Sequence, residues 1–216
     1  MEGPSHVVFG LAGAVVADSI WHISGVPLLG TPLVAHPQQF TDLIAMKAIY
    51  YGFAGIGALT PDIDNARSTI GRKAGIVSKE IQSLAGHRTI FHSIFGLVMV
   101  GAFIWGVQYG VGWLLYYKLG LHQAGEALGA GVSPGFNFAG GPGIAFIGLM
   151  IGYFLHLVAD SLTLGGVPWL WPSRVRYGFP PIRSWRFKSG SRSEPVVVVL
   201  VCIAVIVAIY YGKLTF

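Results

Sequence analysis

The sequence has few charged residues and almost no cysteine. Asp, Glu, Lys and Arg make up 11% of its 216 residues, and the single cysteine, Cys202, lies inside an apolar run. One cysteine excludes an intramolecular disulfide and a cysteine-based zinc site, so a metal would have to be bound by histidine and carboxylate side chains. No lysine or arginine precedes the first apolar run, and Glu2 lies where a signal peptide would carry a cation. We therefore expect this run to be retained.

Apolar residues are correspondingly abundant, at 53% of the sequence with a mean hydropathy of +0.64. Such values lie outside those of soluble domains and predict an all-α, polytopic membrane helical bundle. Five apolar segments are about long enough to cross a bilayer, which predicts about five transmembrane helices in a single domain over residues 1–216. They are residues 7–23, 43–59, 93–117, 143–164 and 195–211, of which the second is short and contains Lys47.

The lysines and arginines predict the orientation of these helices. If the five segments cross alternately, the loops after the second and fourth contain five and six of the 14 cations, and both loops share a side with the N-terminus. Cytoplasmic loops carry the excess of Lys and Arg, so we expect the N-terminus in the cytoplasm and the C-terminus outside. Topology and anionic membrane lipids then explain the net charge of +5, so nucleic acid is not an expected partner.

Histidines and aspartates gather at the ends of the same segments, on the predicted cytoplasmic side. His156 and Asp160 are four residues apart, so they project from one helix face and could share metal ions. A hydrogen bond that only joins two helices is the alternative. Taken together, the set favours two or three divalent ions, because a single structural zinc needs only four ligands. The predicted metal ligands are His6, Asp62, Asp64, His87, His92, His156 and Asp160.

Two of these groups are less specific by themselves. The Asp62-x-Asp64 pair follows a proline, where such residues commonly form a turn or a helix N-cap. His87 and His92 are five residues apart and would diverge on one regular helix. We predict that Thr89 caps the third helix, so that both imidazoles point at one site. Two unrelated interfacial histidines are the alternative.

Three further features concern the surroundings of this site. Arg88 is predicted to hold a phosphoryl or carboxylate group, because a guanidinium makes bidentate bonds; a charge that only sets topology is the alternative. Asp18 belongs to the opposite membrane face, about 18 Å from His6 along the first helix, and is expected to hydrogen-bond within the bundle. Residues 169–192 suit a segment lying along lipid headgroups. Their tryptophans are Trp169, Trp171 and Trp185, and their arginines, from 174 to 192, are expected to contact anionic lipid.

The ordered set of motifs resembles the YdjM-like family of membrane-bound metal-dependent hydrolases. The resemblance covers nearly the whole chain and lies in residues 3–6 (GPSH), 59–64 (LTPDID), 86–93 (GHRTIFHS), 152–160 (GYFLHLVAD) and 166–172 (GVPWLWP). It implies an integral protein of a prokaryotic cytoplasmic (inner) membrane. Some members are labelled LexA-binding, which implies a cytosolic regulatory protein as a partner.

The family is similar, more remotely, to the zinc-dependent phospholipase C and P1-type nuclease group, in which His and Asp side chains hold three zinc ions that cleave phosphoesters. The resemblance implies zinc, with manganese and magnesium as alternatives. One difference is that the group uses an N-terminal tryptophan amine and carbonyl as ligands, a contribution that His6 would replace here.

The resemblance therefore implies hydrolysis of a phosphoester, in a lipid or a membrane-associated substrate, at the cytoplasmic face by metal-activated water. Asp64 or Asp62 would bridge the ions or accept a proton, and Arg88 would hold the phosphoryl group. The alternative is a non-catalytic membrane regulator whose metal cluster only joins helices and whose basic loops recruit a cytosolic protein. Transport is disfavoured, because the polar residues lie at one end of the predicted bundle.

Overall fold

The computed structural model describes residues 1–24, 40–65, 68, 72, 75, 90–114, 117 and 141–211, and in these ranges it contains five α-helices and no β-strand. The all-α membrane bundle predicted from the sequence is confirmed, and each helix lies within a few residues of a predicted apolar segment. The helices are α1 (Gly3–Ser24), α2 (Phe40–Gly57), α5 (Ile94–Trp113), α7 (Gly141–Ser161) and α8 (Ser193–Tyr210), with short 3-10 helices η2 (Thr60–Asp64) and η4 (Arg183–Trp185).

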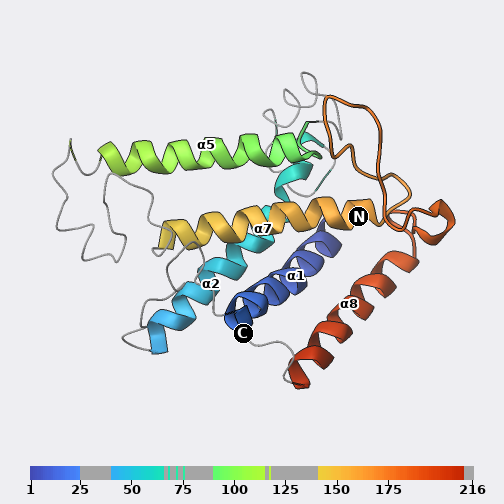
Figure 1. The fold of residues 1–216 in the computed structure, drawn as a ribbon, viewed down its shortest axis with the longest axis horizontal. Helices are drawn as coiled ribbons and strands as arrows, with labels where there is room; N and C mark the ends of the chain where they lie inside the picture. The colour runs from blue at the N-terminus through green and yellow to red at the C-terminus, as the bar shows by residue number, and fades with distance from the viewer. Residues whose placement is uncertain are drawn as a thin grey trace.

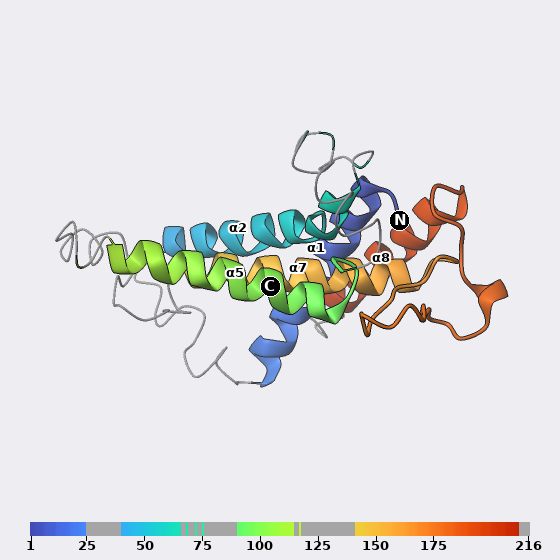
Figure 2. The ribbon, with the colours of Figure 1, turned by 90° about the horizontal axis from the view of Figure 1, so that it is seen from above.

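The central helix is α7 (Figure 1). It packs against α1, α2 and α5, whereas α8 packs against α1 (Figures 1 and 2). Of the α7 span, 61% is buried inside the protein, compared with 11% for α5 and for α8. The outer faces of α5 and α8 are therefore the surfaces that lipid would contact, and polar groups on α7 face other helices.

Two glycines allow α2 to approach α7 closely. Gly148 and Gly152 are four residues apart on one face of α7, and a Cβ atom at either position would collide with a backbone carbonyl of α2, that of Tyr50 or of Ala54. Small residues at this spacing let helix backbones come together in lipid, where packing and not the hydrophobic effect holds helices to one another. Continued by four residues, the same face of α7 reaches His156.

Four of the five described helices, α1, α5, α7 and α8, are long and apolar enough to cross a membrane. The exception is α2, the segment that the sequence analysis found short. Its Lys47 does not lie unpaired in the bundle, because Nζ is 2.6 Å from Oδ2 of Asp18 on α1. Tyr51 Oη donates a hydrogen bond to the same oxygen at 2.8 Å. The expectation that Asp18 hydrogen-bonds within the bundle is confirmed.

Residues 162–192, between α7 and α8, fold back over the end of α7. The backbone N–H of Phe179 donates to Ser161 O at 2.8 Å, and the N–H of Leu164 donates to Phe187 O at 2.9 Å. Isolated β-bridges join Thr163 to Phe187 and residue 167 to residue 177. This segment, which we call the 162–192 segment, covers the bundle end at which the N-terminus also lies (Figure 1).

Candidate metal centre

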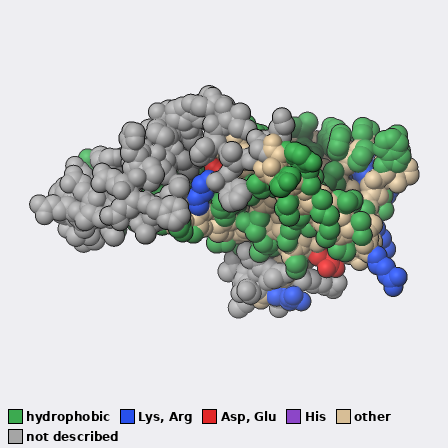
Figure 3. Space-filling view, turned by 90° about the horizontal axis from the view of Figure 1, so that it is seen from below, with side chains coloured by type: hydrophobic (Ala, Val, Ile, Leu, Met, Phe, Trp, Pro, Cys, Tyr) green, Lys and Arg blue, Asp and Glu red, His purple; other side chains and the backbone are tan. Residues whose placement is uncertain are grey.

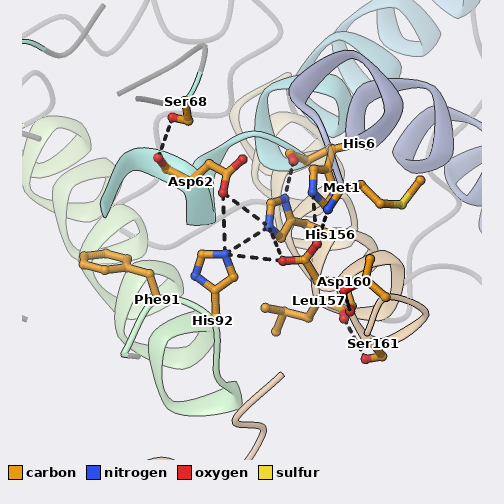
Figure 4. A network of polar contacts seen from close by, with 12 residues as sticks. Met1, His6, Asp62, Ser68, Phe91, His92, His156, Leu157, Asp160 and Ser161 are labelled. Atoms are coloured by element: carbon orange, nitrogen blue, oxygen red, sulfur yellow. Dashed lines mark hydrogen bonds and ion pairs between the residues drawn. The ribbon is translucent and has the colours of Figure 1, made fainter. Parts of the chain in front are cut away.

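Six of the seven predicted ligand residues converge at one end of the bundle, and all of them except Asp64 are labelled in Figure 4. His6 comes from the start of α1, Asp62 and Asp64 from η2, and His92 from the turn before α5. His156 and Asp160 come from the last turns of α7. All six side chains are buried, with no residue more than 6% exposed. The seventh, His87, and the neighbouring Arg88 lie outside the described residues, so their roles stay predictions.

The close packing of α2 on α7 fixes His156. Its Nδ1 lies 2.7 Å from the carbonyl oxygen of Ala58, just after α2. A carbonyl can only accept, so Nδ1 carries the proton and Nε2 keeps its lone pair. That lone pair faces the cluster, 3.3 Å from Nε2 of His92 and 3.9 Å from Oδ2 of Asp160. Backbone bonds to the second imidazole nitrogen are typical of histidines that bind metals.

His92 is held between the two aspartates of η2. Its Nδ1 lies 3.4 Å from Oδ2 of Asp64, whereas Nε2 faces the cluster, 3.6 Å from Oδ1 of Asp62 and 3.7 Å from Oδ2 of Asp160. Asp64 therefore lies on the Nδ1 side of the ring, away from the cluster, and Asp62 on the Nε2 side, toward it. The hydroxyl of Tyr153 donates to the carbonyl of the preceding residue, 91, at 2.6 Å and so fixes the turn that carries His92.

The prediction that Thr89 caps the third helix is wrong. The N-cap is Ser93, which has extended backbone angles and accepts a hydrogen bond from Gly96 N–H at 3.1 Å through its Oγ. Its hydroxyl satisfies an otherwise free N–H of the first helical turn, and a cap at residue 89 would have placed His92 inside the helix. The serine cap leaves His92 in the preceding turn, free to point at Asp62.

His6 stacks on His156, with ring centroids 3.7 Å apart and an interplanar angle of 11°. Its Nε2 lies 3.3 Å from Oδ1 of Asp160, an oxygen that also accepts from the α-amino group of Met1 at 2.5 Å. The Nδ1 atom of His6 is buried and has no hydrogen-bond partner among the described residues. A buried nitrogen without a partner is costly unless a ligand satisfies it.

Glu194, in the first turn of α8, holds the segment that carries His6. Its two carboxylate oxygens accept the backbone N–H groups of Glu2 at 2.6 Å and Gly190 at 2.7 Å, and the residue is 2% exposed. The sequence analysis missed this residue. An acid at the start of the most hydrophobic helix was the available signal, because a charge there needs partners.

Electrostatics favour a cation at this centre. Burial opposes ionisation of Asp62, but its hydrogen bond with His92 and the imidazoles of His156 and His6 lower its pKa below the ordinary value. Burial would lower the pKa of His92, yet its hydrogen bonds to Asp62 and Asp64 raise that pKa to about 9. The carboxylates thus hold positive charge, and a divalent ion would displace the His92 proton.

The donor set fits a divalent metal. Two groups of three residues each offer ligand atoms within 4.8 Å of one another: His6, Asp62 and His156, and His92, His156 and Asp160. Imidazole nitrogen and carboxylate oxygen suit zinc, and a carboxylate-rich set also accepts manganese or magnesium. His156 belongs to both groups but has only Nε2 to offer, because Ala58 O engages Nδ1.

Comparison with known proteins gives a consistent family relationship. A family model described as "YdjM inner membrane protein" matches residues 1–216. The inner membrane protein YdjM of Escherichia coli (strain K12) is 30% identical over 180 residues, covering 83% of this chain and 70% of the relative. The uncharacterized protein YvsG of Bacillus subtilis (strain 168) is 30% identical over 158 residues, covering 69% and 76%. No solved structure matches the chain.

Proposed function

The chain belongs to the YdjM inner membrane protein family, and on that premise we propose that it is a membrane-embedded, metal-dependent hydrolase. The proposed reaction is cleavage of a phosphoester, in a lipid or another membrane-associated substrate, at the cytoplasmic face. The family and the apolar helices make it an integral inner membrane protein. The reaction and the substrate are our inference from the chemistry of the cluster.

The main support is the paired orientation of two imidazoles. His156 and His92 each bind a protein group through Nδ1, Ala58 O and Asp64 respectively, and both present Nε2 to one point, 3.3 Å apart. Two buried nitrogens this close repel each other unless a proton or a cation lies between them. The carboxylates of Asp62 and Asp160 lie next to Nε2 of His92 and add negative charge there.

We propose two or three divalent ions, with zinc first and manganese or magnesium as alternatives. The ions would supply a water of lowered pKa and positive charge against phosphoryl oxygens. Five described residues can bind ions directly, namely His6, Asp62, His92, His156 and Asp160. Bridging carboxylates would let this set hold two ions; a third would need His87. Asp64 could accept a proton or bridge ions only if its contact with His92 were broken, so we propose that it positions His92 instead.

The proposed orientation follows from the basic residues. In the sequence, most Lys and Arg fall between η2 and α5 and between α7 and α8, two segments that begin at the end of the bundle where the cluster lies. By the positive-inside rule this end is cytoplasmic. The N-terminus would then be cytoplasmic and the C-terminus outside. A cytoplasmic site also allows a cytosolic regulatory protein to bind, and the basic residues near the membrane would attract anionic lipids.

The test is turnover together with metal content. We would purify the chain, measure bound metal by mass spectrometry, and assay phosphoester substrates presented in mixed micelles. The Asp160→Asn variant should lose metal and turnover together, because Asp160 contacts both His6 and His92. The matched control is Asp18→Asn. Asp18 is also a buried aspartate, but it lies about 18 Å from His6 along α1. Metal-loaded protein that hydrolyses no phosphoester in such a panel would refute the proposal.

One observation favours a second candidate, a regulator with a purely structural metal cluster. The six described site residues are all buried, and a catalytic ion needs a position open to water and substrate. A structural cluster would have closed coordination and would stabilise the fold, whereas an enzyme would exchange a ligand at one ion. Binding of inorganic phosphate to cobalt-substituted protein, followed by the cobalt absorption spectrum, separates the two. Only an open site should change its spectrum.

A further inference from the structure

The structure contains an apolar cavity on the side of α7 that faces away from the metal centre. Its volume is about 240 Å³, and Val158, Leu162, Trp169, Tyr177 and Phe179 contribute side chains to its lining. Helical spacing of 3.6 residues per turn puts Val158 and Leu162 roughly opposite His156 and Asp160. The cavity is therefore separate from the cluster and needs an explanation of its own.

Most of the cavity lining is apolar. The one hydroxyl of α7 in the cavity wall, that of Ser161, already donates to Leu157 O at 2.8 Å. Aromatic rings of the 162–192 segment form the opposite wall. Pockets for drug-sized ligands span roughly 300–1,000 Å³, so this smaller apolar cavity suits a narrow hydrocarbon chain better than a bulky cofactor.

A cation lies next to one residue of the cavity lining. The guanidinium of Arg186 packs directly on Gly178, a lining residue, so closely that a Cβ atom at this glycine would collide with it. Arg186 is held there by its own hydrogen bonds, from Nε to Pro180 O at 2.8 Å and from Nη2 to Pro181 O at 3.0 Å. Neither bond uses Nη1.

The surrounding segment is cationic and apolar at once. Residues 165–192 contain six lysines and arginines and no acid. Phe179 is 65% exposed and Trp185 is 71% exposed, although both are large hydrophobic residues. Among the described residues of the face shown in Figure 3, hydrophobic side chains predominate, and Lys or Arg side chains extend from its lower right edge. A surface of this kind, between two membrane helices, matches the interface of an anionic bilayer.

We infer that the cavity binds one acyl chain of an anionic phospholipid, whose phosphate pairs with the guanidinium of Arg186. An acyl chain satisfies the apolar lining, and an anionic headgroup complements the excess of positive charge. This lipid is a bound component of the fold and not the substrate, because α7 separates it from the metal centre. The inference is therefore independent of the proposed hydrolase activity.

The experiment measures lipid retained by the full chain in detergent, by native mass spectrometry after incubation with phosphatidylglycerol or phosphatidylcholine. The wild type should retain one phosphatidylglycerol in preference to phosphatidylcholine. Val158→Trp, which fills the cavity, should lose that lipid. Arg186→Gln should still fold, and should reduce the preference for phosphatidylglycerol about fivefold, the effect of one basic residue at an anionic surface.

Two variants control for general effects. Val196→Trp adds the same ring to an exposed position on α8, and Arg174→Gln removes an exposed arginine that lies outside the cavity lining. Neither should change the retained lipid. Equal retention of the two lipids by the wild type would overturn the inference. So would an unchanged preference in Arg186→Gln, even if Val158→Trp does not fold.

Discussion

At the scale of residues, the two nitrogens of each imidazole in the cluster have different surroundings. His156 and His92 use Nδ1 for the protein, on Ala58 O and Asp64, and leave Nε2 for the site. His6 differs, because its Nδ1 is buried without a hydrogen-bond partner among the described residues and its Nε2 faces Asp160. Substitutions at the supporting groups should therefore act through the imidazoles they orient.

Asp64→Asn tests this positioning role. Its amide can keep a contact with His92 but cannot supply the negative charge that raises the pKa of His92. Loss of such a supporting carboxylate typically weakens metal affinity about 10- to 100-fold. We expect that weakening in a zinc titration followed by calorimetry, with the bound stoichiometry unchanged.

Asp62→Asn provides the contrast, because Asp62 lies on the cluster side of His92. If Asp62 binds an ion directly, its variant should lose stoichiometry as well as affinity. A loss of one ion in Asp64→Asn would show instead that Asp64 is itself a ligand, as the sequence first suggested.

The residue types of the site could be predicted from sequence, but their roles could not. Asp62 and Asp64 are equivalent when read as a D-x-D pair, and only the 3-10 turn of η2 sends them to different sides of His92. The contribution of Ala58 was also invisible, because it is made by a backbone carbonyl. Such contacts depend on how α2 docks on α7, which sequence spacing does not specify.

At the scale of elements, one face of α7 combines packing and chemistry. Gly148, Gly152, His156 and Asp160 follow one another at intervals of four residues. The first two positions admit the backbone of α2, and the next two carry ligand groups. The spacing was readable in the sequence, and the His156/Asp160 pair was recognised there. The helix that packs against the two glycines could not be predicted, because small residues indicate close packing but do not specify which helix is the neighbour.

Gly152→Ala tests the coupling between packing and site. The added methyl group would collide with the carbonyl of Ala54, so α2 must move away from α7. Overpacking of this kind costs about 1–3 kcal/mol. The shift should also lengthen the contact between His156 and Ala58 O and weaken zinc binding. Thermal unfolding in detergent and the zinc titration measure the two effects.

A matched control lies on α5. At Gly106 an added Cβ would meet nothing within 4 Å, and alanine has the higher helix propensity, by roughly 1 kcal/mol in water. Gly106→Ala should therefore be neutral or stabilising and should leave zinc affinity unchanged. If the two variants behaved alike, close packing at Gly152 would not be what positions His156.

At the scale of the whole molecule, the cluster joins segments that are distant in the sequence. The start of α1, η2, the turn before α5 and the end of α7 each contribute at least one ligand-type residue. An ion that binds only the folded arrangement stabilises it by mass action. Metal should therefore contribute to the stability of the entire bundle and not to one helix alone.

Removal of metal should lower the melting temperature of the wild type. At a metal concentration of 100 times Kd, binding raises the free energy of unfolding by about 2.7 kcal/mol. This corresponds to a rise in melting temperature of roughly 5–10 °C for a chain of this length. Chelator and re-addition of zinc, followed by thermal unfolding, measure the difference. His156→Ala should melt at the same temperature with and without zinc; a zinc-dependent shift in that variant would place the stabilising ion elsewhere.

The number of membrane crossings depends on α2, the one described helix that is not apolar enough by itself. A lysine or aspartate at the bilayer centre costs about 2.5–3.5 kcal/mol, but Lys47 and Asp18 neutralise each other across α1 and α2. Since α2 also packs along α7, we expect it to cross. Five crossings put the two ends of the chain on opposite sides of the membrane.

Reporter fusions test this arrangement. Alkaline phosphatase fused after Phe216 should be active, as a periplasmic enzyme, and green fluorescent protein at that position should be dark. Fusion after Gly190, in the 162–192 segment, should give the reverse pattern, because that segment is expected on the cytoplasmic side with the metal centre. If α2 lay along the surface instead, only four helices would cross. With the N-terminus in the cytoplasm, the fusion after Gly190 would then report the periplasm and the fusion after Phe216 the cytoplasm, the reverse of the expected pattern.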